Sequence, residues 1–255
     1  SVPVPGDKSI AHRAILLAGL ANGQSRVKGG ALGADNLSTL AALEAMGVTV
    51  DKPSDAPDTL VISGVGLDGL RPPNGPLDCG NSGTTMRLLC GVLVAQRFAT
   101  TLVGDASLSR RPMERVARPL RLRGGRIEGR IDTKRVGEIT APLEIGALPK
   151  SAVLSALEYE MPVASAQVKS AILLSGLWAD GSTYVREPHV SRDHTERLLI
   201  ALGVPIRAIG SMMELDGKSF SGELPAFSIA VPGDPSSAAF LVAAALMITN
   251  SQLTV

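Results

Sequence analysis

The fold is decided by a short stretch, LEAMGVTV at residues 43–50, which recurs as LRLRGGRI at 120–127 and as LIALGVPI at 199–206. In each copy a helix-like pattern ends near a glycine, which is typical of the position just after a helix, and a strand-like run follows. The repeated glycines, Gly47, Gly125 and Gly203, stand at regular intervals of 78 residues (47 to 125 and 125 to 203). The spacing predicts three copies of one structural unit of about 78 residues.

A second kind of segment repeats in the same order along the chain. These apolar runs are AILLAGLA at 14–21, RLLCGVLVA at 87–95 and AILLSGLWA at 171–179, and each follows a small or polar stretch. Since they are apolar on nearly all sides, we expect buried helices, whereas the helices before the repeated glycines carry charges on one face. A fourth apolar helix is predicted to begin near Pro235.

The remaining segments have the composition of strands. TLVISG, TTLVGD, STYVRE and FSIAVPG are rich in β-branched residues and end in turn residues. Each unit therefore reads strand–helix–strand–helix–strand–strand. We predict an α/β fold with a pseudo-threefold repeat of βαβαββ units, in which buried parallel helices lie inside and the sheets lie outside. Two copies of VPGD, at 4–7 and 231–234, bracket this triplet.

Composition narrows the possible functions. The 255 residues are 45% hydrophobic but only 3% aromatic, so a large core of small side chains is expected, and the net charge of +1 favours neither nucleic acid nor an anionic membrane surface. The longest apolar run, at 238–248, is too short to span a bilayer, and no targeting signal is visible, so we expect a cytoplasmic protein.

We expect Cys79 and Cys90 to be reduced packing residues, because neither has metal or redox spacing. Structural or surface roles, and no metal, are expected for the three histidines, His12, His189 and His194.

The starts of the buried helices form a candidate anion site. Helix N-termini carry unpaired N–H groups and about half a positive charge each, and parallel helices around one axis point these ends the same way. Small residues that would let an anion approach there are Gly6, Ser9, Gly80, Ser82, Gly83, Ser165 and Ala166. Nearby cationic side chains are Lys8, Arg13, Arg110, Arg111 and Arg192. Spacing alone is equally compatible with five solvated surface charges.

Five motifs together resemble one enzyme family. They are PGDKSIAHRA at 5–14, GNSGTTMRLL at 80–89, GDASLSRRPM at 104–113, ASAQVKSAILLSG at 164–176 and SRDHTERLL at 191–199. In this order they resemble the 5-enolpyruvylshikimate-3-phosphate synthases, most closely the bacterial branch. The resemblance covers essentially the whole chain but only the N-terminal part of the family's length, somewhat over half of it.

The resemblance implies a fold, a reaction and a set of ligands. The family has two domains, each of three βαβαββ units, and the chain crosses between them at the two VPGD segments. We accordingly expect a complete domain at 6–232, with repeats at about 6–80, 81–160 and 161–232, and pieces of a second domain at 1–5 and 233–255. The family transfers the enolpyruvyl group of phosphoenolpyruvate to the 5-hydroxyl of shikimate 3-phosphate and releases phosphate, without a metal or organic cofactor. A monomeric full-length enzyme, inhibited by glyphosate, is implied.

The same resemblance assigns roles to residues of this chain. Lys8 would lie between the two substrates as the catalytic cation. Binding of shikimate 3-phosphate is implied for Lys8, Ser9, Arg13, Ser165, Ala166, Gln167 and Arg192. Binding of phosphoenolpyruvate is implied for Lys8, Asn81, Gly83, Arg111 and Gln167. Gly83 would also leave room for glyphosate in the phosphoenolpyruvate pocket.

Departures from the family pattern and rival interpretations remain. Ala11 replaces a usual Ser, and GADN at 33–36 replaces a GED pattern, so we expect an acidic residue near the cleft to be lost. The family's acid/base carboxylates lie in its C-terminal half, so negligible turnover is expected from this chain alone.

The alternative is a non-catalytic half that binds shikimate 3-phosphate and needs a complementary chain. The related UDP-N-acetylglucosamine enolpyruvyl transferases use a loop cysteine that GDASLSRRPM lacks, and a structural domain without a ligand is the third interpretation.

Overall fold

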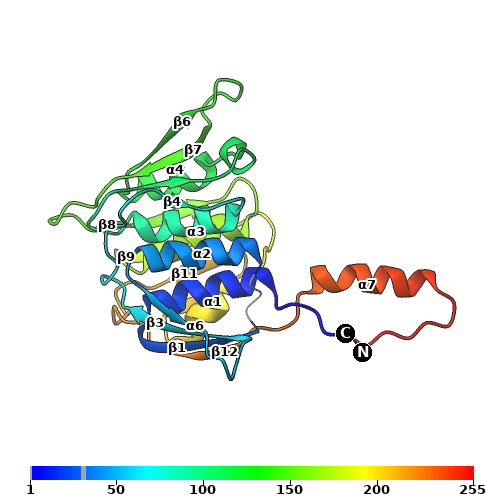
Figure 1. Cartoon of the computed structure of the whole chain (residues 1–255). Coiled ribbons are helices and arrows are strands. Elements are labelled where there is room, and N and C mark those ends of the chain that lie inside the picture. Colours follow the sequence, from blue (N-terminus) through cyan, green and yellow to red (C-terminus); the bar gives the residue numbers. More distant parts are fainter. Residues whose placement is uncertain (1, 30–32) are drawn as a thin grey trace.

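The computed structural model describes residues 2–29 and 33–255, and the predicted repeat is visible in its order of elements (Figure 1). The first unit contains α1 (Lys8–Leu20), β1 (Asn22–Lys28), α2 (Ala34–Ala45), β2 (Thr49–Asp51) and β3 (Thr59–Val65). The second contains β4 (Leu77–Asp78), α3 (Gly83–Leu93), β5 (Thr100–Val103), the short 3-10 helix η1 (Leu108–Arg110), α4 (Glu114–Leu122), β6 (Ile127–Ile131) and β7 (Ile139–Ile145). The third contains β8 (Leu154–Glu160), α5 (Ala166–Gly176), β9 (Ala179–Arg186), α6 (His194–Ala201), β10 (Ile206–Ile209) and β11 (Met212–Leu215).

Each unit forms one four-stranded sheet, and the strand β12 (Ser228–Ala230) completes the first. The sheet orders are β12–β1–β3–β2, β4–β5–β7–β6 and β10–β11–β9–β8. In every sheet the leading strand pairs in parallel with the strand after the buried helix, and the other pairings are antiparallel. The first unit thus takes its leading strand from the far end of the triplet, which ties the end of the third unit to the first.

The helices predicted to be buried form the centre of the domain. Every residue of α1 from Ala11 to Leu20 is buried, and α3 and α5 are nearly as enclosed. The backbones of α3 and α5 approach so closely that a Cβ atom on Gly91 would overlap the backbone of Ala171. Figure 1 shows α1, α2 and α3 stacked between the sheet of β1 and β3 and the sheet of β6 and β7. Small side chains therefore allow the inner helices to pack, as the composition predicts.

The register of the repeated glycines needs one correction. Gly47, Gly124 and Gly203 have φ values of 96°, 99° and 84°, and the N–H of each closes the preceding helix in the same way. The N–H of the next residue donates to the carbonyl one residue before the acceptor of the glycine, which is the Schellman pattern that requires a left-handed residue. In the Gly124–Gly125 pair the first glycine takes this position. The counterpart of Gly47 is therefore Gly124, not Gly125 as the equal spacing predicted.

The two VPGD segments lie side by side. The Asp7 N–H donates to the Pro232 carbonyl at 2.7 Å, and the Asp234 N–H donates to the Pro5 carbonyl at 2.8 Å, so Gly6 and Gly233 face each other in an antiparallel bridge. The second segment leads into α7 (Pro235–Met247), the helix predicted to begin near Pro235, which extends away from the domain (Figure 1). Among the described residues, no helix combines the length and apolar character needed to cross a membrane.

Candidate functional site

The N-termini of the three inner helices meet at one cleft, as expected for parallel helices around an axis. A cavity of about 500 Å³ is lined by Ser9 of α1, Thr84 of α3 and the α5 residues Ala166 and Gln167. A second cavity of about 830 Å³ shares Ser9, Thr84 and Gln167 with it and extends toward the first residues of α7. The helix starts therefore direct their N–H groups and positive dipole ends toward shared space.

Each of these helix starts is capped by a side chain. Asp7 accepts a hydrogen bond from the Ile10 N–H at 2.9 Å, and Ser82 accepts one from the Thr85 N–H at 3.1 Å. Ser165, a predicted ligand residue, accepts from the Val168 N–H at 3.4 Å and also lines the smaller cavity. The small polar residues before the apolar runs thus begin the helices.

Lys8 lies at the start of α1 and faces the larger cavity. Its Nζ lies 2.9 Å from the Asp35 Oδ2 of α2, and the Lys8 side chain is 53% exposed. Asp35 belongs to GADN, so this segment still places a carboxylate beside Lys8, and the expected loss of an acidic residue concerns Ala34, the position before it. The first residues of α2 bring this carboxylate to Lys8, and Asn36 also donates to the Lys8 carbonyl at 3.1 Å.

Two predicted arginines surround Ser9 in different ways. Arg192 is exposed, lines both cavities and donates from Nη1 to the Ser9 Oγ at 3.0 Å. Arg13 is only 3% exposed and donates to the Ser9 carbonyl at 2.8 Å, to Thr195 Oγ1 at 2.7 Å and to Ser170 Oγ at 2.9 Å. Burial lowers the pKa of Arg13 to about 10, and the charge of nearby Glu196 opposes that shift, so Arg13 remains a cation at neutral pH. Arg13 therefore joins α1, α5 and α6 beneath the cavity.

Gln167 connects the start of α5 to the start of α3. Its Nε2 donates to Thr84 Oγ1 at 2.8 Å, and its Oε1 accepts from Arg87 Nη1 at 3.0 Å. Arg87 also donates to the carbonyl oxygens of Gly83 and Pro112, both at 3.1 Å. Gln167, which was predicted to bind both substrates, thus lies in a network that fixes two of the three helix starts relative to each other.

Asn81, Gly83 and Arg111 are brought together beside this network. Arg111 Nη2 donates to Asn81 Oδ1 at 2.7 Å, and Asn81 Nδ2 donates to Asp105 Oδ2 at 2.6 Å. A Cβ atom on Gly83 would lie 2.6 Å from Arg87 Nη1 and 3.0 Å from Arg111 Nη1. Glycine at this position therefore lets two guanidinium groups approach the first turn of α3.

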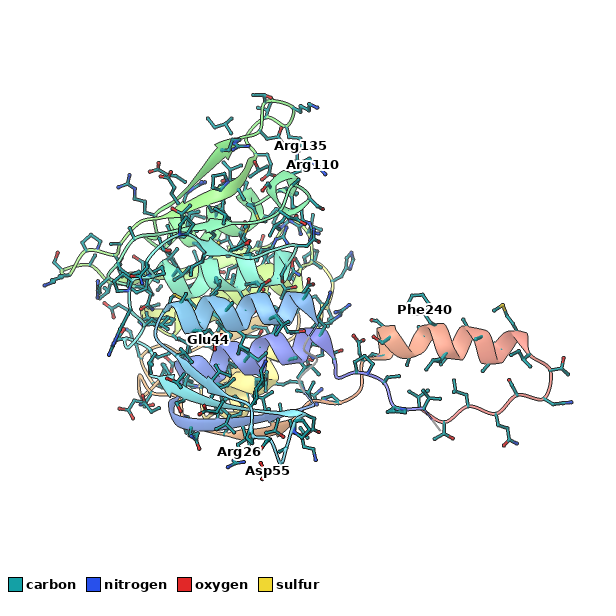
Figure 2. All side chains as sticks on the ribbon, in the orientation of Figure 1. Arg26, Glu44, Asp55, Arg110, Arg135 and Phe240 are labelled. Carbon is teal, nitrogen blue, oxygen red and sulfur yellow. The ribbon has the colours of Figure 1, made fainter. Side chains whose placement is uncertain are left out.

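Arg110 does not join the other predicted cations. It is exposed near the β6–β7 hairpin, and its carbonyl accepts a hydrogen bond from Arg135 at 2.8 Å (Figure 2). Neither cleft cavity is lined by Arg110, and neither is lined by Asn81, Gly83 or Arg111, which join the site through Arg87 and the start of α3. Since Arg110 closes the 3-10 helix η1, the adjacent Arg111 turns back toward Asn81 instead.

Sequence reasoning missed two charged residues of the site. Arg87 follows Gly83 by four residues within the motif GNSGTTMRLL, so helical spacing could have placed it on the same face. Asp35 had no such local signal, because its contact with Lys8 depends on how α2 packs against α1.

The buried histidine and the cysteines have environments that disfavour charge. Burial lowers the pKa of His12 to about 4, and its Nδ1 lies 2.7 Å from Thr39 Oγ1, so the ring is neutral at neutral pH. Burial raises the pKa of Cys90 to about 12 and raises that of Cys79 well above its ordinary range. Both cysteines are free and buried, which confirms the predicted packing role. His189 is exposed, and the described residues contain no cluster of three potential metal ligands.

Comparisons with known proteins place the chain in one family. The family model described as EPSP synthase (3-phosphoshikimate 1-carboxyvinyltransferase) matches residues 1–255. A 3-phosphoshikimate 1-carboxyvinyltransferase of Alkalilimnicola ehrlichii is 52% identical over 252 residues, which are 98% of this chain and 53% of that protein. The one from Methylococcus capsulatus is 50% identical over 252 residues, 99% of this chain and 54% of the relative.

A solved structure gives the same result for the fold. The EPSP synthase from Acinetobacter baumannii is similar with a TM-score of 0.85 and 46% identity, over 96% of this chain and 52% of that one. The predicted fold class is confirmed, and the chain spans about half the length of the relatives it matches. With five motifs, three repeated units and a cleft at three helix starts in agreement, the chain belongs to the EPSP synthase family.

Proposed function

We propose that this chain supplies the N-terminal wall of the active site of a 3-phosphoshikimate 1-carboxyvinyltransferase. The enzyme would move the enolpyruvyl group of phosphoenolpyruvate to the 5-hydroxyl of shikimate 3-phosphate and release phosphate. The observation that carries the proposal is the convergence of three helix N-termini with Lys8 and Arg192 on one cleft, in a member of this family.

The chemistry of the cleft suits two anionic substrates. Bringing two polyanions together requires fixed positive charge, and preorganised N–H groups and cations provide it without further reorganisation. In this proposal Arg192 and the start of α5 hold the phosphate of shikimate 3-phosphate, and Ser9 and Arg13 hold its carboxylate. Arg111, Asn81 and the start of α3 hold phosphoenolpyruvate, and Lys8 offsets the charge that develops between the substrates.

The proposal includes a division into domains. Residues 6–232 would form the complete three-repeat domain, and residues 1–5 and 233–255 would belong to a second domain. Two observations support it: the crossing strands meet at Gly6 and Gly233, and the Val2 N–H donates to the Thr254 carbonyl at 3.1 Å, beyond the crossing. The opposing wall, with the proton-transfer groups, would come from that second domain. A monomeric enzyme in the bacterial cytoplasm is part of the proposal, and the two free, buried cysteines support a reducing compartment.

Calorimetry with shikimate 3-phosphate tests the proposal directly. We expect this chain to bind the ligand, Arg192→Ala to weaken binding by about tenfold or more, and Arg110→Ala to leave it unchanged, since Arg110 lies outside the cleft. Lys8→Ala should weaken binding less, because its ammonium already pairs with Asp35. If Arg192→Ala left the affinity for shikimate 3-phosphate as unchanged as Arg110→Ala does, that result would contradict the proposed anion site.

A non-catalytic binding half is the alternative, and turnover distinguishes it. With both substrates present we expect no turnover from this chain alone, and turnover after addition of a C-terminal polypeptide from a relative. Binding that no complementary chain converts into turnover would favour the alternative. Turnover by this chain alone would overturn the proposed division of the active site.

Glyphosate sensitivity follows from the same proposal. Gly83 leaves the space beside Arg87 and Arg111 open, and a Cβ atom there would crowd both guanidinium groups. In a full-length enzyme that contains these residues, Gly83→Ala should raise the glyphosate concentration needed for half inhibition by at least tenfold. Equal inhibition of the variant and its parent would contradict this assignment.

A further inference from the structure

A buried ion cluster lies directly behind the candidate anion site. Lys169 of α5 is 2% exposed, and its Nζ lies 2.7 Å from Glu187 Oε1 and 2.7 Å from Glu196 Oε1. Glu187 and Glu196 are 5% and 1% exposed. Neither substrate role in the proposed function uses these three residues. Burying an ammonium and two carboxylates is costly unless they are paired, so their placement calls for an explanation.

The two carboxylates lie at opposite ends of one loop. Glu187 directly follows β9, and Glu196 lies in the first turn of α6, so the loop at 187–193 connects them. A single ammonium, that of Lys169, therefore fixes both ends of the loop to the side of α5. Arg192 belongs to this loop.

Further hydrogen bonds tighten the loop just before Arg192. Glu187 Oε1 accepts from the Ser191 N–H at 3.0 Å, and Glu187 Oε2 accepts from the Ser191 hydroxyl at 2.6 Å. Burial opposes ionisation of Glu187, but the bonds from Lys169 and Ser191 bring its pKa below the ordinary value, so it remains a carboxylate. The residue that follows, Arg192, then reaches Ser9 at 3.0 Å.

The other end of the loop is bound through Arg13. Thr195 accepts from Arg13 Nε at 2.7 Å and donates to Ser170 at 2.7 Å, which ties the first turn of α6 to α1 and α5. The charge of Glu196 also favours the cationic form of Arg13. The ion pair with Lys169 is therefore the direct compensation of the Glu196 charge, because the Glu196 oxygens accept no hydrogen bond within the described residues.

We propose that Lys169, Glu187 and Glu196 are positioning residues that hold Arg192 at the anion site. This inference rests on the proposed function, which identifies the anion as the phosphate of shikimate 3-phosphate. The cluster restrains the loop before the ligand arrives, so the guanidinium loses less conformational freedom on binding. Lys169 is the central member because, among the described residues, it is the cation that pairs with both carboxylates.

The test measures affinity for shikimate 3-phosphate in Glu187→Gln, alone and combined with Arg192→Ala. The glutamine amide has nearly the same volume as the carboxylate, but only its oxygen can accept a hydrogen bond. It therefore cannot accept both of the hydrogen bonds that Ser191 donates to Glu187 Oε1 and Oε2. Glu214→Gln is the matched control, because Glu214 is a buried carboxylate in the same sheet that pairs with Arg207 at 3.0 Å and with Tyr184 at 3.0 Å, away from the loop. We expect Glu187→Gln to weaken binding about tenfold and Glu214→Gln to change it less than twofold.

The combined variant separates positioning from general destabilisation. If Glu187 acts through Arg192, Glu187→Gln should have no further effect on affinity once Arg192 is Ala, although the thermal midpoint still falls. An equal loss in both backgrounds would overturn the inference. A normal affinity of Glu187→Gln, with Arg192→Ala still weakened, would overturn the inference and leave the proposed function standing. An Arg192→Ala chain that binds normally would overturn both.

Ser191→Ala provides a second variant if Glu187→Gln fails to fold. It removes one hydrogen bond from the loop and leaves every buried charge in place. We expect an affinity loss of about threefold that also disappears in the Arg192→Ala background. A loss that persists there would contradict positioning through Arg192.

Discussion

The two VPGD segments lie side by side, yet the helices they begin have opposite environments. Both end in an aspartate that caps its helix, Asp7 for α1 and Asp234 for α7. From Ala11 onward α1 is buried, whereas no residue of α7 is buried within the described chain. Yet α7 has no charged residue and α1 has three ionisable ones. Local sequence therefore determines where each helix begins, while its burial depends on what packs around it.

In contrast to α1, the helix α7 exposes large apolar side chains. Phe240 is 81% exposed and Leu246 is 83% exposed, and Figure 2 shows the Phe240 side chain on the projecting helix. Large exposed apolar side chains on one helix are typical of an interaction surface. Our proposal assigns the covering of this surface to the second domain.

The largest expected difference in the free energy of unfolding is between leucine substitutions in α1 and in α7. Leu16→Ala in α1 removes a side chain that is 0% exposed, and we expect it to lower the free energy of unfolding by about 3–5 kcal/mol. Leu246→Ala in α7 should change it by less than about 0.5 kcal/mol in this chain, because the side chain is already in water. Denaturant unfolding of both variants measures the difference. A comparable loss from Leu246→Ala would mean that α7 packs on the domain.

The next largest difference in stability is expected between alanine substitutions of Gly6 and Gly233, the two glycines that face each other where the VPGD segments pair. A Cβ atom on Gly6 would overlap the carbonyl of Gly29, a backbone group that cannot rotate away, so Gly6→Ala should cost about 1–3 kcal/mol. A Cβ atom on Gly233 would meet only Val4 Cγ2 at 2.8 Å, which a side-chain rotation can relieve. We expect Gly233→Ala to cost less than half as much in thermal unfolding. Equal losses would show that the crossing strands are constrained alike.

Much of the fold could be predicted because its signals are local. Apolar runs, capping residues and helix-ending glycines repeat at nearly constant spacing, so the three units were identifiable from the chain alone. The error between Gly124 and Gly125 arose because either glycine fits the pattern, and only the backbone conformation selects the first. The parallel pairing of β12 with β1 had no local signal, since it joins distant segments.

The candidate site was predictable to a similar extent. Lys8 and Gln167 lie at helix starts, where sequence motifs and dipole arguments both apply. Asp35 and the cluster around Lys169 depend instead on contacts between separate helices and loops within one unit. The periodicity of a single segment does not indicate which side chains of other segments will contact it.

A smaller effect is expected from the two capping aspartates. Asp7→Ala removes the acceptor for the Ile10 N–H at a buried helix start, and a lost cap costs about 1 kcal/mol of global stability. Asp234→Ala should leave global unfolding nearly unchanged and instead increase hydrogen exchange in the first turn of α7. Exchange measured by mass spectrometry separates the two outcomes. If Asp234→Ala destabilised the domain as much as Asp7→Ala, the start of α7 would be part of the cooperative core.

The smallest effect concerns the response of Asp234 to pH. Burial opposes its ionisation, but N–H groups of Ser236, Lys8 and Ser237 bond to the carboxylate and lower its pKa below the ordinary value. Its contribution is therefore complete above the ordinary pKa of an aspartate and is lost as pH falls through the lower, folded-state pKa. We expect the Ser236 amide resonance to titrate with a midpoint below the usual aspartate range, and this transition to vanish in Asp234→Asn. A midpoint at or above that range would mean that the cap is not formed, and the similarity between the two VPGD segments would then stop at the backbone bridge.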